Sequence, residues 1–139
     1  MEVQINYIAV VIAMLSSLMV GFIWYSKPVF GKDWARLTRV KLADNGKGAI
    51  TPIAATFIVS LITAYVIANL SYLSNAFFQN DFLQDALTTA FWLWLGLVAA
   101  RLITHDAFER RSLKLTAINL GNEFVTIMLM GLIIGLFGV

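Results

Sequence analysis

The sequence predicts an all-α, polytopic membrane protein with four transmembrane helices and a short interfacial amphipathic helix after the first. Sixty per cent of its 139 residues are hydrophobic and only 13% are charged, so the charges could not cover a water-exposed globule. Four apolar runs each approach the roughly 20 residues that cross a hydrocarbon core. The basic residues cluster in alternate connections between these runs. Residues 1–139 are therefore expected to form a single four-helix transmembrane domain.

The spans are predicted at about 3–25, 50–73, 82–104 and 113–137. The third is the weakest, because only Ala86–Ala100 is free of charge within it. Asp85 and Arg101 should then lie near its two ends, where a long arginine side chain can reach the interface.

Charge placement predicts the orientation of the chain. All ten basic residues lie between the first and second spans or around the connection of the third to the fourth, and none lies in the Ser71–Asp81 loop. They are Lys27, Lys32, Arg36, Arg39, Lys41, Lys47, Arg101, Arg110, Arg111 and Lys114. The positive-inside rule puts both basic connections in the cytoplasm and both chain ends outside. The net charge of +2 reflects this bias, and we expect no nucleic-acid partner.

Small residues occupy every fourth position on the first two spans. They are Ala9, Ala13, Ser17 and Gly21 on the first, and Thr56, Ser60, Ala64 and Ala68 on the second. Such stripes let two helix backbones approach closely, so we expect them to face each other in an antiparallel hairpin. The alternative is a chance spacing, since alanine and serine are common in membrane helices.

An amphipathic segment follows the first span, at about 30–42. On a helical wheel its apolar residues separate from its basic ones. The apolar face holds Phe30, Trp34, Leu37 and Val40, and the basic face holds Lys32, Arg36 and Arg39. We expect this helix to lie on the cytoplasmic surface with its basic residues against anionic lipid headgroups. The alternative is a solvated basic loop.

The last span carries a polar face. Asn119, Glu123 and Thr126 share it with Asn122 adjacent, and no charged residue follows Glu123. Glu123 should lie roughly 12 Å inside the boundary, where an ionised carboxylate is costly unless it is paired or solvated. It is either a proton or cation site, or part of a hydrogen-bonded knot with Asn119, Asn122 or Arg101.

The same span ends with Gly131-Leu-Ile-Ile-Gly135, a small-xxx-small pair. Such a pair indicates a close helix contact, within the chain or between copies.

Few residues offer catalytic or metal chemistry. The chain has no cysteine and one histidine. His105 lies beside Asp106 and Glu109, which do not complete a ligand set. No nucleophile–base pair, phosphate-binding loop or carboxylate dyad is present. We therefore expect neither an enzyme nor a bound cofactor or metal.

The segment Trp24-Tyr-Ser-Lys-Pro-Val-Phe-Gly-Lys-Asp-Trp34 resembles a known signature, Trp-Tyr-Ser-Pro-x-x-Phe-Gly-Lys-x-Trp. This signature is that of a family of small bacterial membrane proteins catalogued as domain of unknown function seventeen-sixty-one. The matching residues are Trp24, Tyr25, Ser26, Phe30, Gly31, Lys32 and Trp34. Trp94-Leu-Gly96, Gly121 and Leu129-Met-Gly131 also fit, whereas Lys27 stands where the family usually has proline. The resemblance implies a four-helix inner-membrane protein and transfers no activity.

These observations predict a small oligomeric permease or transporter-like protein with Glu123 as its ionisable centre. Four short helices leave little room for a solvated path within one copy, so a homo-oligomer is expected. The alternative is a non-catalytic scaffold or auxiliary subunit of a larger membrane complex, and a membrane enzyme comes third. A cavity at Glu123 favours transport, and a fully hydrogen-bonded Glu123 favours the scaffold.

Overall fold

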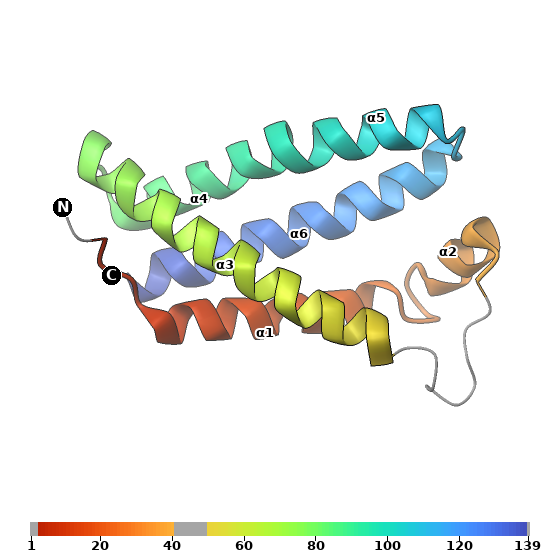
Figure 1. Ribbon diagram of the computed structural model, residues 1–139, viewed down its shortest axis with the longest axis horizontal. Coiled ribbons are helices and arrows are strands. Elements are labelled where there is room, and N and C mark those ends of the chain that lie inside the picture. Colours follow the sequence, from red (N-terminus) through yellow and green to blue (C-terminus); the bar gives the residue numbers. More distant parts are fainter. Residues whose placement is uncertain (1–2, 41–49, 139) are drawn as a thin grey trace.

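The computed structural model describes residues 3–40 and 50–138, and all regular structure within them is helical. Four helices are long and apolar enough to cross a membrane (Figure 1). They are α1 (Tyr7–Trp24), α3 (Ile50–Phe78), a continuous third helix made of α4 (Phe82–Leu93), η1 (Trp94–Ala99) and α5 (Ala100–Phe108), and α6 (Leu113–Phe137). The predicted all-α architecture with four membrane-spanning helices is confirmed.

Local signals explain where the helices begin. The side chain of Asn6 caps α1, accepting a hydrogen bond from Ala9 N at 3.2 Å. Ser112 caps α6 in the same way, through Leu115 N at 3.3 Å. Each cap satisfies a backbone N–H that the first helical turn leaves without a partner.

Two helices run further than the apolar pattern predicts. Helix α3 continues to Phe78 and α5 to Phe108, against expected ends at 73 and 104. No proline or glycine interrupts either extension, so the helix propagates past the end of the hydrophobic run. The predicted Ser71–Asp81 loop is wrong, since only residues 79–81 separate α3 from α4.

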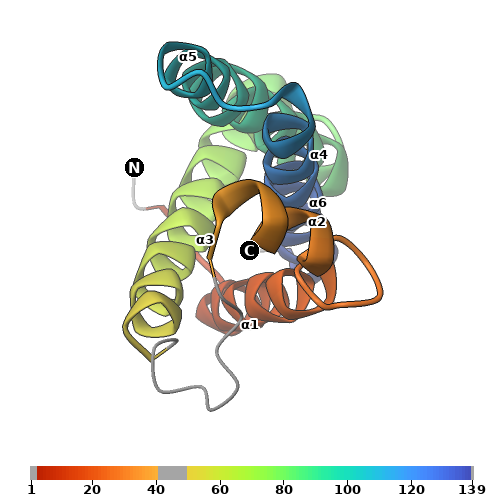
Figure 2. The same cartoon turned by 90° about the vertical axis from the view of Figure 1, so that its right-hand side faces the viewer.

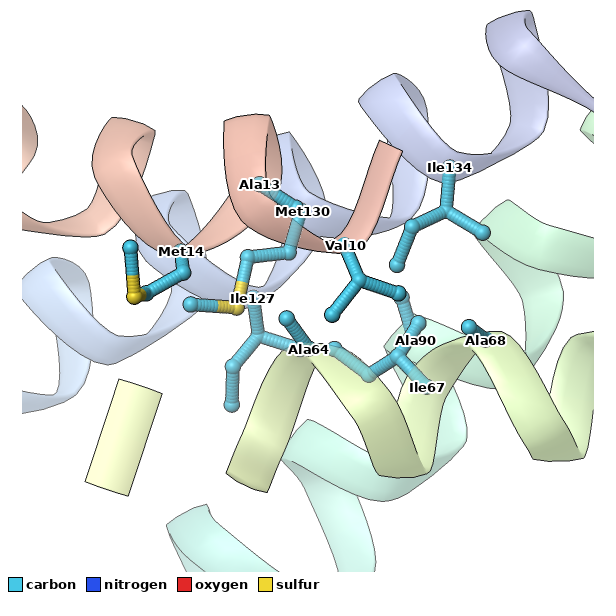
Figure 3. Close-up of a cluster of buried hydrophobic side chains, with 10 residues drawn as sticks. All are labelled: Val10, Ala13, Met14, Ala64, Ile67, Ala68, Ala90, Ile127, Met130 and Ile134. Carbon is cyan, nitrogen blue, oxygen red and sulfur yellow. The ribbon is translucent and has the colours of Figure 1, made fainter. Parts of the chain in front are cut away.

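Helix α6 is the centre of the bundle. Helices α1 and α4 pack along it, and α3 packs obliquely across α1 and α4 (Figures 1 and 2). The core where the helices meet is drawn in Figure 3. It comprises Val10, Ala13, Met14, Ala64, Ile67, Ala68, Ala90, Ile127, Met130 and Ile134. The four alanines in this set allow close backbone approach, and the longer side chains fill the space between them.

The glycine pair of α6 makes a contact within the chain. A Cβ on Gly131 would lie 2.6 Å from Ala90 Cβ, and one on Gly135 would lie 2.9 Å from Leu83 Cα. Ala86 and Ala90 on the facing side of α4 are fully buried. The absence of a side chain at these glycines therefore sets the distance between α4 and α6.

The two small-residue stripes differ along their length. Six of their eight members are buried in the bundle, namely Ala9, Ala13, Ser17, Ser60, Ala64 and Ala68. The other two, Gly21 and Thr56, are more exposed and line an open groove together with Ser17 and Ser60, and a Cβ on Gly21 would meet nothing within 4 Å. Helices α1 and α3 are thus close in the core and leave a groove where the stripes end.

The bundle has two chemically different ends. The chain termini and the α3–α4 turn lie at one end, and helix α2 (Gly31–Thr38) and the α5–α6 turn lie at the other (Figure 1). We call the latter the basic end. It carries Lys27, Lys32, Arg36, Arg39, Arg110, Arg111 and Lys114.

Helix α2 is shorter than the predicted segment 30–42. It ends at Thr38, because Arg39 adopts a left-handed conformation with φ 58°. Trp34 and Leu37 are half-buried, whereas Lys32, Arg36 and Arg39 are exposed. Residues 41–42 of the prediction, with Lys41 and Lys47, lie outside the described residues.

Candidate functional site

Three polar residues of α6 line a groove bounded by α1, α3 and α6. The groove has a volume of about 530 Å³, and Asn122, Glu123 and Thr126 lie along its α6 wall. Glu123 and Thr126 share a face because they are three residues apart on a helix. The structure therefore brings together three of the five residues predicted for the intramembrane polar site.

The other walls of the groove mix hydroxyl and apolar groups. Helices α1 and α3 contribute hydroxyls from Ser17, Thr56, Ser60 and Thr63, and Tyr25 lies at the end of α1. The apolar lining consists of Leu18, Phe22, Ile53, Ala55, Val59, Ile127 and Met130. Such a lining can accommodate an amphipathic ligand or a hydrated ion near the carboxylate.

Glu123 itself is half-buried. Its carboxylate makes no hydrogen bond or salt bridge with any residue that the structure describes. An intramembrane carboxylate without a protein partner must be protonated, solvated or bound to a ligand. The groove beside it leaves space for each of these.

The neighbours of Glu123 divide into two groups. Asn122 lines the groove and is buried, and its amide nitrogen has no hydrogen-bond partner within the described residues. Asn119, one turn earlier, accepts a hydrogen bond from the Tyr25 hydroxyl at 3.1 Å. Thr116 is buried and donates to the carboxylate of Asp106 at 2.6 Å. Polar groups of α6 toward the basic end are therefore engaged in structural contacts.

Arg101 does not join this site. It is exposed on α5, outside the groove, and forms no salt bridge with Glu123. Of the three partners predicted for a hydrogen-bonded knot at Glu123, Arg101 is therefore wrong, because its side chain lies on the surface.

The first two signature residues attach the end of α1 to α6. The Trp24 indole donates to the Ile118 carbonyl at 3.0 Å, and its ring covers Gly121. A Cβ at Gly121 would lie 2.8 Å from Trp24 Cζ2, so the ring needs glycine there. Together with the Tyr25–Asn119 bond, this contact positions the α1 end next to Glu123.

The following residues fold into a compact turn. The Ser26 carbonyl accepts from Val29 N at 3.1 Å and from Gly31 N at 2.9 Å, and the Trp24 carbonyl accepts from Phe30 N at 3.1 Å. A side chain at Gly31 would overlap the carbonyl oxygens of Tyr25 and Ser26. Glycine is therefore required by close backbone approach, and we call residues 24–31 the signature turn.

Aromatic and charged contacts join α2 to this turn. The rings of Trp24 and Phe30 lie 4.8 Å apart, and those of Tyr25 and Trp34 lie 5.4 Å apart. Asp33 accepts a hydrogen bond from Lys114 of α6 at 2.7 Å. That hydrogen bond and the charge of Lys114 lower the pKa of Asp33 below its usual value. Helix α2 is thus tied to α6 by Asp33 and to the end of α1 by Trp34, while Lys32 of the signature is exposed.

Two buried carboxylates were not predicted from the sequence. Asp85 is almost fully buried at the start of α4 and accepts from Asn75 at 2.9 Å and Asn80 at 3.0 Å. Asp106 is equally buried beneath Thr116 and Arg111. The asparagines around Asp85 were the available signal, since amide donors can satisfy a buried carboxylate.

A π-helical segment, η1, also went unpredicted. It spans Trp94–Ala99 and contains the Trp94-Leu-Gly96 motif. The Trp94 ring packs edge-on against Phe124 at 4.8 Å, and its indole nitrogen is buried without a partner in the described part of the chain. Such segments are rare and recur at functional sites. Among the described residues, no group of His, Asp or Glu side chains could hold a metal ion.

Comparison with curated proteins and with solved structures gives no match. A family model does match, over residues 8–135, which include the signature turn, Glu123 and most of all four long helices. Because the match covers nearly the whole chain, it agrees with the resemblance read from the sequence. The chain belongs to the family described as "Protein of unknown function (DUF1761)".

Proposed function

We propose that this chain is a small permease or transporter-like protein in which Glu123 binds the transported or coupling cation. One observation carries the proposal: Glu123 lies on a groove of about 530 Å³ and has no protein partner among the described residues. A carboxylate of this kind can exchange a proton or cation during a transport cycle, whereas a fully hydrogen-bonded one would resist changes of charge.

The packed core limits the path within one copy. The groove ends at Ile127 and Met130, which belong to the buried core together with Val10 and Ile134. Transport by a single chain would have to open this core. We therefore propose a homo-oligomer in which the groove is completed between copies, and large exposed apolar side chains of α1 and α3, such as Phe22 and Ile58, are available for that contact.

A scaffold or auxiliary subunit is the second candidate. It is favoured by the use of polar groups on α6 as attachment points. Asn119 holds Tyr25, the Ile118 carbonyl holds Trp24, and Thr116 holds Asp106. In this alternative Glu123 is one more structural group.

Replacing the carboxyl of Glu123 separates the two candidates. Glu123→Gln keeps the side-chain size and removes titration. We expect infrared spectra of the purified wild-type protein to show a carboxyl band that changes as the pH is varied across the range in which the protein stays folded, and that disappears in Glu123→Gln. The variant should retain its fold and oligomeric state, as measured by circular dichroism and size-exclusion chromatography with light scattering.

Glu109→Gln is the matched control, because Glu109 is an exposed carboxylate outside the groove. It should leave the titrating band in place. A Glu123 that keeps one protonation state over the whole range would contradict the proton-exchange role. Loss of folding in Glu123→Leu with tolerance of Glu123→Gln would then favour the scaffold.

We further propose that the chain resides in the inner (plasma) membrane with its basic end in the cytoplasm and both termini outside. Support comes from charge and geometry together. The basic residues gather at the end that holds α2, and both termini lie at the other (Figure 1). In this orientation Lys32 and Arg36 of α2, and Arg39 directly after it, would face anionic headgroups.

Reporter fusions test the orientation. A reporter enzyme that works only in the periplasm should be active when it is fused after Val139. A reporter that works only in the cytoplasm should be active when it is inserted at Gly46. The pair serves as its own control, since both fusions share the same four spans. A cytoplasmic signal from the C-terminal fusion would overturn the proposed topology.

A further inference from the structure

A second groove lies at the basic end, between α2 and the turn that joins α5 to α6. Its volume is about 590 Å³. The apolar side chains of Trp34, Leu37 and Leu115 line it together with charged groups from the ends of α2 and α5. The charged residues are Arg39, Glu109, Arg110 and Arg111. This groove is separate from the one at Glu123, because the two share no lining residue.

The charges of this groove leave two arginines available. Arg111 pairs with Glu109, and its Nε lies 3.7 Å from Asp106. Arg39 and Arg110 are exposed and form no ion pair with any described residue. The groove therefore combines an apolar lining with two cations that have no acidic partner in the described part of the chain.

Both of these arginines have an unusual backbone. Arg39 has φ 58° at the end of α2, and Arg110 has φ 54° after α5. Helix ends of this geometry favour glycine, because a Cβ raises the energy of the left-handed conformation. The helix dipole favours a cation at the C-terminal end of α2 and at that of α5. It does not explain why both cations border one groove. A shared anionic ligand explains it.

Exposed apolar residues indicate the depth of this groove in a bilayer. Phe108 and Leu113 stand on either side of the α5–α6 turn, and each is 87% exposed. Large apolar side chains at a membrane surface insert among the acyl chains, and neighbouring cations lie at headgroup level. With Phe108 and Leu113 inserted in this way, the two arginines would lie at the height of the lipid phosphates.

We propose that this groove binds one anionic phospholipid, with Arg39 and Arg110 contacting its headgroup phosphate and the Trp34–Leu37–Leu115 wall contacting the adjoining acyl chains. Arginine suits this role, since its planar guanidinium donates two parallel hydrogen bonds to a phosphate. The proposed occupant is a lipid and not a free anion, because the same groove that holds the arginines is also lined by the apolar side chains of Trp34, Leu37 and Leu115.

Glycine substitution tests the proposal without loss of fold. The double variant Arg39→Gly/Arg110→Gly removes both cations and relieves both left-handed positions, so its melting temperature should equal or exceed that of the wild type. Native mass spectrometry of the detergent-purified protein with added phosphatidylglycerol should show retention of one lipid by the wild type. We expect at least about tenfold weaker retention by the variant.

Gln79→Gly is the matched control, since Gln79 has φ 56° after α3 and lines neither groove. It relieves the same backbone strain at the opposite end and should leave phosphatidylglycerol retention unchanged. Arg39→Lys/Arg110→Lys keeps the charges but not the planar guanidinium groups, so its retention should lie between those of the wild type and the glycine variant. If the glycine variant fails to fold, Arg39→Gln/Arg110→Gln compared with the lysine variant gives the same contrast.

Three results would overturn the proposal. The first is undiminished phosphatidylglycerol retention by the folded glycine or glutamine variant. The second is equal retention of zwitterionic phosphatidylcholine by the wild type. The third is displacement of phosphatidylglycerol by an equal concentration of inorganic phosphate, which would identify the ligand as a free anion.

Discussion

Gly31→Ala should destabilise the protein by about 3 kcal/mol, because the added methyl group has no space in the signature turn. It would overlap the carbonyl oxygens of Tyr25 and Ser26, and these are backbone atoms that cannot rotate away. The Ser26 carbonyl also accepts two of the hydrogen bonds that close the turn. Opening the turn would therefore break those bonds and displace α2 from α6.

Denaturant titration in mixed micelles, followed by tryptophan emission, measures this loss. A red shift of emission under native conditions should accompany it, since Trp24 and Trp34 both pack on residues of the turn or α2. Gly21→Ala is the matched control. The same methyl group meets nothing within 4 Å there, and alanine in a helix interior is neutral or stabilising by up to about 1 kcal/mol. Equal stability of the two variants would contradict the close packing at Gly31.

Gly131→Leu should have a comparable effect, a loss of about 3 kcal/mol through separation of α4 from α6. Even a Cβ would lie 2.6 Å from Ala90 Cβ and 3.2 Å from the Ala86 carbonyl oxygen. A leucine cannot fit unless α4 and α6 move apart, because the missing side chains of Gly131 and Gly135 allow these helices to lie this close. The free energy of unfolding in micelles measures the loss.

Gly96→Leu is the control for size and hydrophobicity, because Gly96 is exposed and a Cβ there meets nothing within 4 Å. A rescue provides a second check. The smaller substitution Gly131→Ala should be destabilising alone and largely tolerated when combined with Ala90→Gly, since the pair exchanges one methyl group between facing positions. Additive losses in the double variant would exclude direct contact of residues 90 and 131.

The four spans could be predicted because hydropathy is a property of each segment alone. An apolar run of bilayer length must be helical, since its backbone groups have no other hydrogen-bond partners in lipid. The ends were predicted less well. Helices α3 and α5 outlast their apolar runs because nothing in residues 74–78 or 105–108 breaks a helix.

The candidate site was only partly predictable. The spacing of Asn119, Glu123 and Thr126 on one helix determines that they share a face, but it does not determine what that face meets. The packing of α1 and α3 decided that Glu123 lines a groove, and that Asn119 instead holds Tyr25. Arg101 was misassigned for the same reason. Its height along the third helix can be predicted from the sequence, but the direction in which its side chain points from that helix cannot.

The sequence by itself determined the helical class, the number of spans, the clustering of basic residues at alternate connections, and the presence of one carboxylate deep in the last span. Each follows from local composition. Only the tertiary structure decided the partners: Trp24 over Gly121, Asp33 with Lys114, Gly131 against Ala90, and two arginines on one groove. These contacts join residues distant in the chain, and they depend on how whole helices rotate and cross, which no single segment encodes.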